Sequence, residues 1–355
     1  MTNTILEVDM NNFLNNKRKI EEYTPNKIIM PVLKANAYGT YINENIEILN
    51  QFSIVATATV QEAVKIREIG YEKEIFVLNQ PTIEEIQTIH KHNITIGLSE
   101  REFLKKVSVP IRVHLELETG MNRTGIQESK LEETIEEIKN NPNIIVEGAY
   151  THFSVADTEI DYTNQQIEKF HNMITIIQKE WQLKYIHTSA SSGILRVDDK
   201  ISNTIRPGLL LYGYYPFPDA NQMITVKPIT KLKTKITYLK EIEAGESISY
   251  GRTFTANKKM QIATIPIGYA DGLKRAYGKT GYVIIQGKKC KIVGTICMDS
   301  CMIDVTGFKV HVGEEVYIWD NEIITLEDIA KELKTISYEI LATIGPRVTR
   351  IYKKK

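Results

Sequence analysis

Short apolar, β-branched runs alternate with amphipathic segments over residues 5–213. The runs predict strands at Ile5–Met10, Ile28–Leu33, Ser53–Ala58, Glu74–Leu78, Ile94–Leu98, Ile111–Glu118, Ile144–His152, Tyr185–Thr188 and Thr204–Tyr212. Between them, apolar residues recur at helical spacing at Leu131, Ile135 and Ile138 and at Ile167, Phe170, Ile174 and Ile177, which predicts helices with one buried face. Eight or nine such units in about 210 residues favour an (α/β)8 barrel of the TIM type, because an open doubly wound sheet would usually carry a Gly-x-Gly-x-x-Gly turn before its first helix.

The pattern changes after about residue 220 to short strands separated by turns that contain glycine. The strands predicted there are Lys231–Leu239, Gln261–Pro266, Tyr282–Ile285, Cys290–Val293 and Glu315–Trp319. We therefore expect an α/β barrel domain over residues 1–220 and a mostly β C-terminal domain over residues 221–355.

The composition of the chain excludes several classes of binding partner. The chain has 44 basic and 44 acidic side chains and 42% hydrophobic residues, a balance typical of a globular protein and unsuited to binding nucleic acid or anionic lipid. Cys290, Cys297 and Cys301 are odd in number and too few for a disulfide framework, and they do not form a metal set. No run reaches the ~18 apolar residues of a membrane span, and no signal pattern opens the chain. These observations predict a cytoplasmic protein without a metal, a nucleic-acid partner or a membrane partner.

Lys34 is the first candidate for chemistry, because it is a lone charge at the carboxyl end of an apolar predicted strand. Barrel enzymes hold their active sites at that end of the strands. A lysine in such a place can have a lowered amine pKa and can form a Schiff base with an aldehyde cofactor. Taken alone, however, Lys34 is better explained as a lysine that extends into solvent.

Further segments decide between these readings. Lys34–Gly39, with the sequence Lys-Ala-Asn-Ala-Tyr-Gly, resembles the pyridoxal-phosphate lysine motif of alanine racemases. Segments that resemble the same family follow in its order at Thr119–Gly125, Thr151–Phe153, His187–Ser191, Arg206–Leu209, Ser249–Thr253, Pro266–Gly272 and Cys297–Asp299. Each could singly be a turn glycine, a surface arginine or a core histidine, but chance does not produce the ordered set. The resemblance implies pyridoxal 5′-phosphate as cofactor and conversion of L-alanine to D-alanine for cell-wall peptide.

The resemblance also implies roles for individual residues. Lys34 would hold the cofactor and exchange a proton on one face of the substrate α-carbon, and Tyr250 would act on the other face. In the family this tyrosine belongs to the partner subunit, so a homodimer with shared active sites is implied. A phenol has a pKa near ~10, so its use as a base needs cations nearby, and we expect His152 and Arg206 to supply them. Arg206 would face the pyridine nitrogen, and because arginine stays protonated the ring would be a weak electron sink, which suits proton exchange over transamination.

The remaining roles concern binding. Positions that resemble the family's contacts to the cofactor phosphate are Tyr38, Ser191 and the backbone N–H groups of Gly208 and Leu209. Positions that resemble its contacts to the substrate are Arg123, Tyr269 and the backbone amide of Met298, the last two from the partner subunit. We expect Asp299 to orient the loop that carries Met298.

The sequence departs from the family at three places. Many members have a lysine at position 116, which becomes carbamylated and orients the arginine of the Thr-Gly-Met motif, whereas this chain has Glu116. We expect the Glu116 carboxylate to orient Arg123 without bicarbonate. Pro346 replaces the tyrosine of the usual Tyr-Arg-Val-Pro-Arg motif and so removes a hydroxyl beside the substrate. Gly39–Tyr41 reads Gly-Thr-Tyr instead of Gly-His-Gly, with an effect that the sequence leaves open.

Other functions follow from these departures and from shared architecture. Relatives that racemise serine also lack the tyrosine at position 346, so a serine or broad-specificity racemase, including the vancomycin-resistance type, is an alternative. Basic amino-acid decarboxylases share this architecture, but in them a carboxylate pairs with the pyridine nitrogen. The resemblance places Arg206 at that position in this chain, so a decarboxylase is disfavoured. A pyridoxal-phosphate homeostasis protein without racemase activity would need neither Tyr250 nor a second domain.

Overall fold

The computed structural model describes residues 3–354, which divide into two compact units. The barrel unit comprises Leu14–Ala37 and Ile42–Lys227. The C-terminal unit comprises the residues up to Phe13, Tyr38–Tyr41 and the residues from Pro228 onward. The division therefore differs from the expected boundary at residue 220, because two short N-terminal segments belong to the second unit.

The barrel unit is built on a sheet of eight parallel strands in the order β2-β9-β8-β7-β6-β5-β4-β3. A parallel bridge between Val32 and Ala56 joins the two end strands, with hydrogen bonds from Leu33 N to Ala56 O at 2.8 Å and from Ala56 N to Pro31 O at 2.9 Å. The strands are β2 (Ile28–Ile29), β3 (Ile54–Thr57), β4 (Glu74–Val77), β5 (Thr95–Leu98), β6 (Ile111–Glu116), β7 (Ile144–Tyr150), β8 (Tyr185–Ala190) and β9 (Thr204–Arg206). The expected barrel is confirmed.

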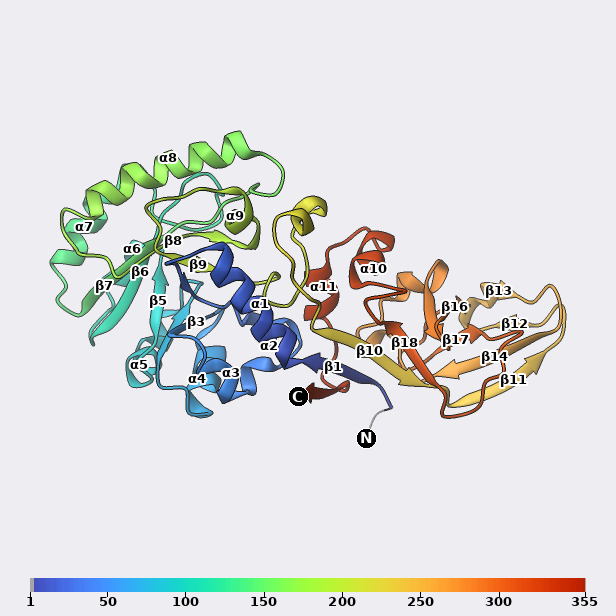
Figure 1. The fold of residues 1–355 in the computed structure, drawn as a ribbon. Helices are drawn as coiled ribbons and strands as arrows, with labels where there is room; N and C mark the ends of the chain where they lie inside the picture. Colours follow the sequence, from blue (N-terminus) through green and yellow to red (C-terminus); the bar gives the residue numbers. More distant parts are fainter. Residues whose placement is uncertain (1–2, 355) are drawn as a thin grey trace. The chain divides into compact units, whose positions relative to one another are not determined.

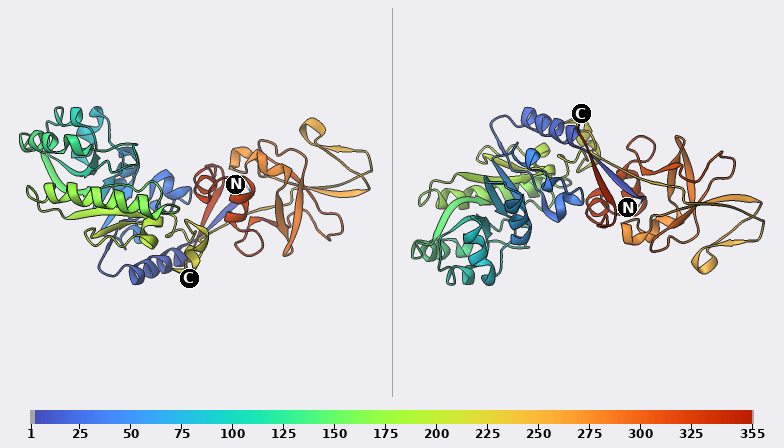
Figure 2. Two further views of the ribbon diagram at one scale, coloured as in Figure 1. Left: turned by 90° about the horizontal axis from the view of Figure 1, so that it is seen from above. Right: turned by 90° about the horizontal axis from the view of Figure 1, so that it is seen from below.

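Helices lie along the outside of the barrel strands (Figure 1 and Figure 2). They are α1 (Met10–Tyr23), α3 (Ile46–Leu49), α4 (Val60–Glu68), α5 (Ile86–Lys91), α6 (Arg101–Leu104), α7 (Leu131–Lys139), α8 (Ile160–Ile177) and α9 (Ser191–Arg196), with 3-10 turns η1 (Ile42–Glu44), η2 (Ile83–Glu85), η3 (Glu128–Lys130) and η4 (Pro218–Gln222). The short segment α2 (Lys34–Tyr38) is not a right-handed helix, because Ala35, Asn36 and Ala37 have positive φ values. The helices predicted around Ile135 and Ile174 are α7 and α8, and each buries its apolar face. None of the helices in the described part of the chain is both long and apolar enough to cross a membrane.

Three strand predictions for the barrel were wrong in part. Ile28–Leu33 is a strand only over β2 (Ile28–Ile29), followed by an isolated bridge at Val32. Ile5–Met10 contains a strand, β1 (Ile5–Asp9), but this strand pairs antiparallel with β10 and parallel with β19 of the C-terminal unit. Thr204–Tyr212 is a strand only as far as Arg206. Pro207 follows it and has no N–H to donate to a neighbouring strand, and the residues from Gly208 to Gly213 form turns.

The C-terminal unit is mostly β, as expected. Its nine-stranded sheet has the order β11-β14-β17-β16-β15-β18-β10-β1-β19. Its elements after β1 are β10 (Thr230–Lys235), β11 (Tyr238–Ile242), β12 (Ser247–Ile248), η5 (Tyr250–Arg252), β13 (Phe254–Thr255), β14 (Met260–Ile265), η6 (Tyr269–Asp271), η7 (Arg275–Lys279), β15 (Tyr282–Ile285), β16 (Lys288–Val293), β17 (Cys301–Asp304), β18 (Glu315–Trp319), α10 (Leu326–Glu332), α11 (Ser337–Ala342) and β19 (Thr349–Lys353). The single strand predicted at Lys231–Leu239 is split between β10 and β11.

Candidate active site

The carboxyl ends of the barrel strands bring several predicted site residues to one face of the barrel unit. Lys34 follows the bridge residue Val32, Glu116 ends β6, Ser191 follows β8 and Arg206 ends β9. Because all eight strands are parallel, these ends lie on the same side of the barrel, where enzymes of this fold hold their reacting groups.

The backbone after Lys34 has an unusual conformation. Ala35, Asn36, Ala37 and Tyr38 have φ values of 54°, 52°, 51° and 54°, and Gly39 continues the run at 72°. Left-handed conformation costs roughly 1–2 kcal/mol for each residue with a Cβ. The carboxylate of Glu62 accepts a hydrogen bond from Ala35 N at 2.7 Å and so helps to hold the start of this turn. The turn ends the strand abruptly and leaves Lys34 accessible at the barrel mouth.

Lys34 has the electrostatic surroundings of a nucleophilic amine. Although the residue as a whole is accessible, the surrounding protein desolvates its ammonium group. This desolvation and the positive charges of Arg123 and Arg206 lower the pKa of Lys34, while Glu62 opposes that shift. A lowered pKa increases the fraction of neutral amine at pH 7, and only the neutral amine can attack an aldehyde.

Arg206 is 2% exposed and is surrounded by neutral acceptors. Its Nη1 donates to Nδ1 and to the carbonyl of His187, both at 2.8 Å. Its Nη2 donates to the carbonyls of Thr151 and Thr188 at 2.8 and 2.9 Å, and His152 Nδ1 lies 3.3 Å away. Burial lowers the pKa of Arg206 to about 10, so the guanidinium is still charged at neutral pH. Among the described residues, the Nε–H of Arg206 is left without an acceptor.

His152 does not supply the positive charge that we expected of it. Burial and the charges of Arg206, Arg123 and Lys34 lower the pKa of His152 to about 3, so its imidazole is neutral at neutral pH. The cationic character of this region comes from Arg206, Arg123 and Lys34. Surrounding cations leave no favourable place for a further proton on the ring.

Glu116 is 4% exposed and accepts a hydrogen bond from Thr124 Oγ1 at 2.9 Å. Burial raises the pKa of Glu116, while Thr124 and Arg123 oppose that rise. The structure therefore brings Glu116 close enough to influence Arg123 electrostatically, but the hydrogen bond that its carboxylate accepts at 2.9 Å comes from Thr124. A direct contact between Glu116 and Arg123 is not part of this arrangement.

The loop that carries Arg123 is held by a residue that the sequence analysis did not single out. Glu118 accepts hydrogen bonds from Gly120 N and, at 2.9 Å, from Asn122 N. Tyr162 of α8 donates to Gly120 O at 2.9 Å. Glu118 lies directly before the Thr-Gly-Met motif. Its position two residues before a glycine turn was the sequence signal that could have identified it as the acceptor of the loop's N–H groups.

Three of the positions predicted to contact a phosphate, Ser191, Gly208 and Leu209, lie together in the barrel unit. Ser191 Oγ accepts hydrogen bonds from Gly208 N at 3.2 Å and from Leu210 N at 3.3 Å. Within residues 3–354 the N–H of Leu209 donates to no acceptor, so that group and the Ser191 hydroxyl hydrogen are free to bind an anion. Tyr38 belongs to the C-terminal unit, where it is 6% exposed and its ring centroid lies 5.8 Å from that of Tyr338.

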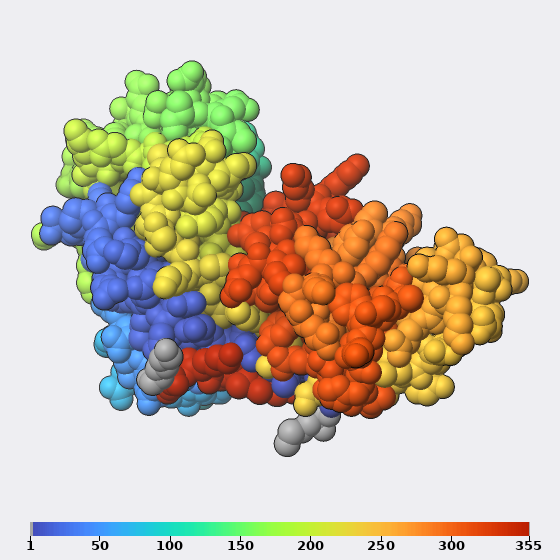
Figure 3. Space-filling view, turned by 45° about the vertical axis from the view of Figure 1, so that its right-hand side comes forward, coloured from blue at the N-terminus to red at the C-terminus, as the bar shows by residue number. Residues whose placement is uncertain are grey.

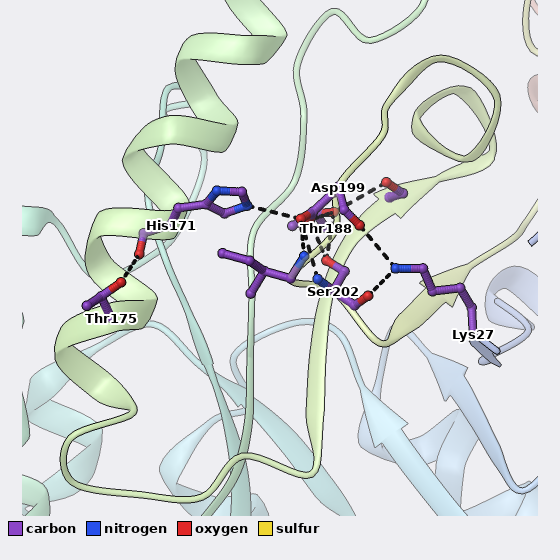
Figure 4. A network of polar contacts seen from close by, with 8 residues as sticks. Lys27, His171, Thr175, Thr188, Asp199 and Ser202 are labelled. Carbon is purple, nitrogen blue, oxygen red and sulfur yellow. Dashed lines mark hydrogen bonds and ion pairs between the residues drawn. The ribbon is translucent and has the colours of Figure 1, made fainter.

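A polar network fixes the strands that carry these groups (Figure 4). Asp199, in the β8–β9 connection, accepts hydrogen bonds from Thr188 at 2.8 Å and from Ser202, and His171 of α8 lies 3.0 Å away. Lys27, which precedes β2, donates to the carbonyls of Asp199 and Ser202. The network therefore connects β2, β8 and β9, the strands that precede Lys34, Ser191 and Pro207.

The C-terminal unit exposes the predicted partner-subunit residues. Tyr250, Tyr269 and Met298 are 73%, 44% and 52% exposed. Figure 3 shows the segment around residue 250, in yellow-orange, at the surface of this unit. Their loops are linked, because Thr295 Oγ1 donates to Tyr250 O at 3.0 Å, Tyr269 N to Cys297 O at 3.1 Å and Ala270 N to Met298 O at 3.0 Å. The N–H of Met298 has no acceptor among the described residues.

Asp299 is paired as an orienting residue would be. Its Oδ1 lies 2.7 Å from Arg347 Nη1, and the same guanidinium lies 3.1 Å from the buried Asp271. Arg347 and Asp271 were missed as individual residues, although Asp271 ends the Pro266–Gly272 motif. Pro346 lies in the exposed turn directly before Arg347.

The residues of the barrel unit fit pyridoxal phosphate. Lys34 offers an amine of lowered pKa, Arg206 offers a free Nε–H, and Leu209 and Ser191 offer donors for a phosphate. The described residues contain no group of three or more His, Cys, Asp or Glu side chains that could hold a metal ion.

Comparison with known proteins adds an independent line of support. The sequence matches the family description "Alanine racemase, N-terminal domain" over residues 8–216 and "Alanine racemase, C-terminal domain" over residues 229–352. It is 35% identical over 366 residues to Alanine racemase 2 of Caldanaerobacter subterraneus, covering 98% of this chain and 94% of that relative. It is 34% identical over 367 residues to Alanine racemase 1 of Clostridium acetobutylicum, covering 98% and 95%.

Solved structures agree with these relatives. The alanine racemase of Clostridium difficile 630 matches with a TM-score of 0.94 at 33% identity, covering 99% of this chain and 96% of that one. The alanine racemase of Bacillus anthracis with bound L-Ala-P matches with a TM-score of 0.94 at 30% identity, covering 100% and 96%. The resemblance seen in the sequence motifs is confirmed, and the chain belongs to the alanine racemase family.

Proposed function

We propose that this chain is a pyridoxal-phosphate-dependent racemase that interconverts L- and D-alanine and supplies D-alanine for cell-wall peptide. The observation that carries the proposal is Arg206, a buried cation with only neutral hydrogen-bond partners at the barrel mouth that holds Lys34. Pyridoxal phosphate, when bound to Lys34, supplies the conjugated ring that accepts electron density from the substrate α-carbon. Arg206 would donate to the ring nitrogen of the bound cofactor and keep its own proton, so the ring would remain a weak electron sink, which favours proton exchange.

Two residues move the proton. Lys34, with its lowered pKa, accepts or donates the proton on one face of the α-carbon. Tyr250 of a second copy does so on the opposite face. The high exposure of Tyr250, Tyr269 and Met298 supports this arrangement, because large apolar side chains grouped on a surface mark an interaction site. We therefore propose a homodimer with shared active sites.

Substrate and cofactor are held by charge and by free backbone donors. Arg123, on the loop held by Glu118, binds the substrate carboxylate together with the N–H of Met298 from the second copy. The Ser191 hydroxyl and the free N–H of Leu209 bind the cofactor phosphate, and Tyr38 adds its hydroxyl. The N–H of Gly208, which donates to Ser191 Oγ in this structure, would have to leave that bond to bind the phosphate as well. Glu116 supplies the negative charge that orients Arg123.

A second candidate activity follows from Pro346. Its side chain has no hydroxyl and lies in an exposed turn of the C-terminal unit, so the pocket that receives the substrate side chain lacks a polar wall that the family usually provides. A racemase that accepts serine as well as alanine is therefore the alternative.

Chiral chromatography of products from L-alanine and L-serine, incubated separately with the cofactor-loaded protein, tests both activities. Tyr250→Phe should lower the rate of D-alanine formation by at least ~100-fold while the absorbance of the bound cofactor is unchanged. Tyr238→Phe, which alters another exposed tyrosine of the same unit, is the matched control. Equal rates for Tyr250→Phe and the unaltered protein would refute the two-residue mechanism.

Subunit complementation tests the shared site. Lys34→Ala and Tyr250→Phe proteins should each be inactive alone. Unfolded and refolded together in equal amounts, they should recover about a quarter of the full activity, because half of the dimers then contain one site with both intact residues. No recovery from a mixture that forms dimers would show that each chain uses its own Tyr250.

A further inference from the structure

A line of hydrogen bonds runs from Arg206 into the interior of the barrel. Arg206 Nη1 lies 2.8 Å from His187 Nδ1, and His187 Nε2 lies 2.9 Å from His114 Nδ1. The two histidines are 0% exposed and Arg206 is 2% exposed. His114 lies on β6 and His187 on β8, so the line crosses the barrel core between strands that are not neighbours.

The chemistry of arginine fixes the direction of every hydrogen bond in this line. A guanidinium only donates, so His187 Nδ1 must be the acceptor and its proton must lie on Nε2. His187 Nε2–H then donates to His114 Nδ1, which places the proton of His114 on its Nε2. In the described part of the chain, His114 Nε2 is buried and has no hydrogen-bond partner.

Both rings are neutral and tightly packed. Burial, with the nearby cations Arg112 and Arg206, lowers the pKa of His114 to about 3, and burial together with Arg206 lowers the pKa of His187 well below its ordinary value. The His187 ring stacks on Tyr150 at 4.9 Å with an interplanar angle of 2°. A Cβ on Gly148 would lie 2.8 Å from His114 Cδ2, so no space remains on that side of the ring.

An apolar side chain would stabilise the core better than His114 does. A buried N–H without an acceptor costs roughly 1–3 kcal/mol, and leucine at this position would avoid that cost. The histidine therefore needs another explanation, and its single hydrogen bond, from His187, supplies one.

We propose that His114 is a positioning residue, which holds His187 in the tautomer that accepts from Arg206 and so fixes the guanidinium that faces the pyridine nitrogen of the cofactor. Without an acceptor at His114, His187 can move its proton to Nδ1, and Arg206 then loses the acceptor for one Nη1 hydrogen. The guanidinium plane becomes free to turn. The role at the ring nitrogen rests on the proposed function, whereas the tautomers of the two histidines do not.

The tautomers can be observed directly. The protein has seven histidines, and ¹⁵N NMR of the imidazoles in the cofactor-loaded protein, assigned with single His→Gln variants, distinguishes Nε2–H from Nδ1–H. We expect Nε2–H for both His114 and His187, without titration between about pH 5.5 and 8.5, because a pKa of about 3 lies far below that range. An Nδ1–H signal for His187, or protonation of either ring in that range, would overturn the proposal.

Cofactor binding tests the effect on Arg206. His114→Leu removes the acceptor, whereas His114→Asn places an amide oxygen where Nδ1 lies. Each purified protein, freed of cofactor, is titrated with pyridoxal phosphate and with an analogue in which CH replaces the ring nitrogen. His114→Leu should weaken binding of pyridoxal phosphate by about fivefold to tenfold, the loss of roughly one hydrogen bond. It should change binding of the analogue by less than about twofold, and His114→Asn should restore most of the loss.

The outcomes separate the possible explanations. Equal weakening for both compounds would mean that His114 only supports the fold, and the proposal would be wrong. An unaltered protein that binds both compounds equally would also refute the role at the ring nitrogen. Discrimination that His114→Leu abolishes, in a protein that racemises no amino acid, would support the positioning role and refute the proposed function. If His114→Leu does not fold, the NMR result and the comparison of His114→Asn with the unaltered protein still test whether His114 is a positioning residue.

Discussion

Removing the charge of Asp199 should loosen β8 and β9 selectively. Asp199→Asn keeps the size of the side chain and one oxygen, but it replaces a charged acceptor of the bonds from Thr188, Ser202 and His171 with a neutral amide. A hydrogen bond to a charged group contributes about 0.5–1 kcal/mol more than a neutral one. Over these contacts the free energy of local opening should fall by roughly 2 kcal/mol, or about 30-fold in the opening equilibrium.

Amide hydrogen exchange followed by mass spectrometry measures this opening. Peptides that cover residues 185–206 should exchange about 30-fold faster in Asp199→Asn, while peptides from β14 and β17 should be unchanged. The control is Asp198→Asn, because Asp198 is the adjacent residue, is exposed and has only a 3.9 Å ion pair with Lys200. Acceleration spread evenly over both units, or an equal effect of Asp198→Asn, would refute the reasoning.

The contribution of the Asp199 carboxylate to the stability of the fold should decrease at low pH. Burial would raise the pKa of Asp199, but hydrogen bonds from Ser202, His171 and Thr188 outweigh it and the pKa lies below its ordinary value. The carboxylate therefore stabilises the fold fully above the unfolded-state pKa of about 4, and this contribution is lost as the pH falls through the lower folded-state pKa. The difference between the unaltered protein and Asp199→Asn should be constant from about pH 8 to 5 and shrink below about pH 4.

Two further predictions concern the substrate. Glu118→Gln should raise the KM for alanine roughly threefold to tenfold with little change in kcat. The reason is that the loop that carries Arg123 loses the charged acceptor of its Gly120 and Asn122 N–H groups. Glu128→Gln, at an exposed position, is the control, and an unchanged KM in Glu118→Gln would contradict the role of Glu118. Pro346→Tyr should raise the ratio of kcat/KM for alanine to that for serine at least about threefold. Under the proposed function, position 346 lies beside the substrate side chain, and a tyrosine ring and its hydroxyl would fill that space. Steady-state kinetics with both amino acids measures the ratio, and an unchanged ratio would show that position 346 does not set specificity.

Much of the barrel follows from local pattern. Runs such as Ile54–Ala56 and Ile75–Val77 are apolar because parallel strands are buried on both faces, and this signal is visible in a single chain. In β1, Leu6 and Val8 alternate with Glu7 and Asp9, which also indicates a strand, and both apolar residues are 0% exposed. Which sheet they join is set by distant partners on β10 and β19, so the strand was predicted correctly and its sheet was not.

The conformation at Lys34 could not be predicted from residue preferences. Alanine favours a right-handed helix, yet Ala35 and Ala37 are left-handed. Contacts from far along the chain hold the end of this turn in the C-terminal unit, where Arg350 donates to Gly39 O at 3.0 and 2.9 Å and Tyr352 donates to Thr40 O at 3.1 Å. Identification of Lys34 itself depended on the resemblance, since a lysine at a strand end carries little information alone.

The charge state of His152 shows a second limit of sequence reasoning. A histidine beside a predicted tyrosine base suggested a cation, but the pKa of His152 depends on how many cations the fold places around it. Arg206, Arg123 and Lys34 come from three separate segments, and only the barrel brings their charges together. A motif suggests how two residues interact, but it does not include the combined electrostatic effect of several charges that the fold brings together.

Glu116 allows a test of whether the activity of this chain depends on bicarbonate. Its carboxylate is buried, accepts from Thr124 and is close enough to Arg123 for their charges to interact. Glu116→Gln keeps an oxygen for Thr124 and removes the charge. Interactions of this kind contribute roughly 1–2 kcal/mol, so the KM for alanine should rise about fivefold to 30-fold with a smaller change in kcat.

The bicarbonate response distinguishes this role from simple packing. The unaltered protein should have the same activity in degassed buffer and in buffer with added bicarbonate, because Glu116 supplies its charge covalently. Glu116→Lys should become dependent on bicarbonate, since a lysine at this position can regain a negative charge only by carbamylation. Thr124→Val, which removes the hydroxyl donor and leaves the carboxylate, is the control and should change KM less than Glu116→Gln does. Stimulation of the unaltered protein by bicarbonate, or an unchanged KM in Glu116→Gln, would mean that Arg123, the residue proposed to bind the substrate carboxylate, is oriented without Glu116.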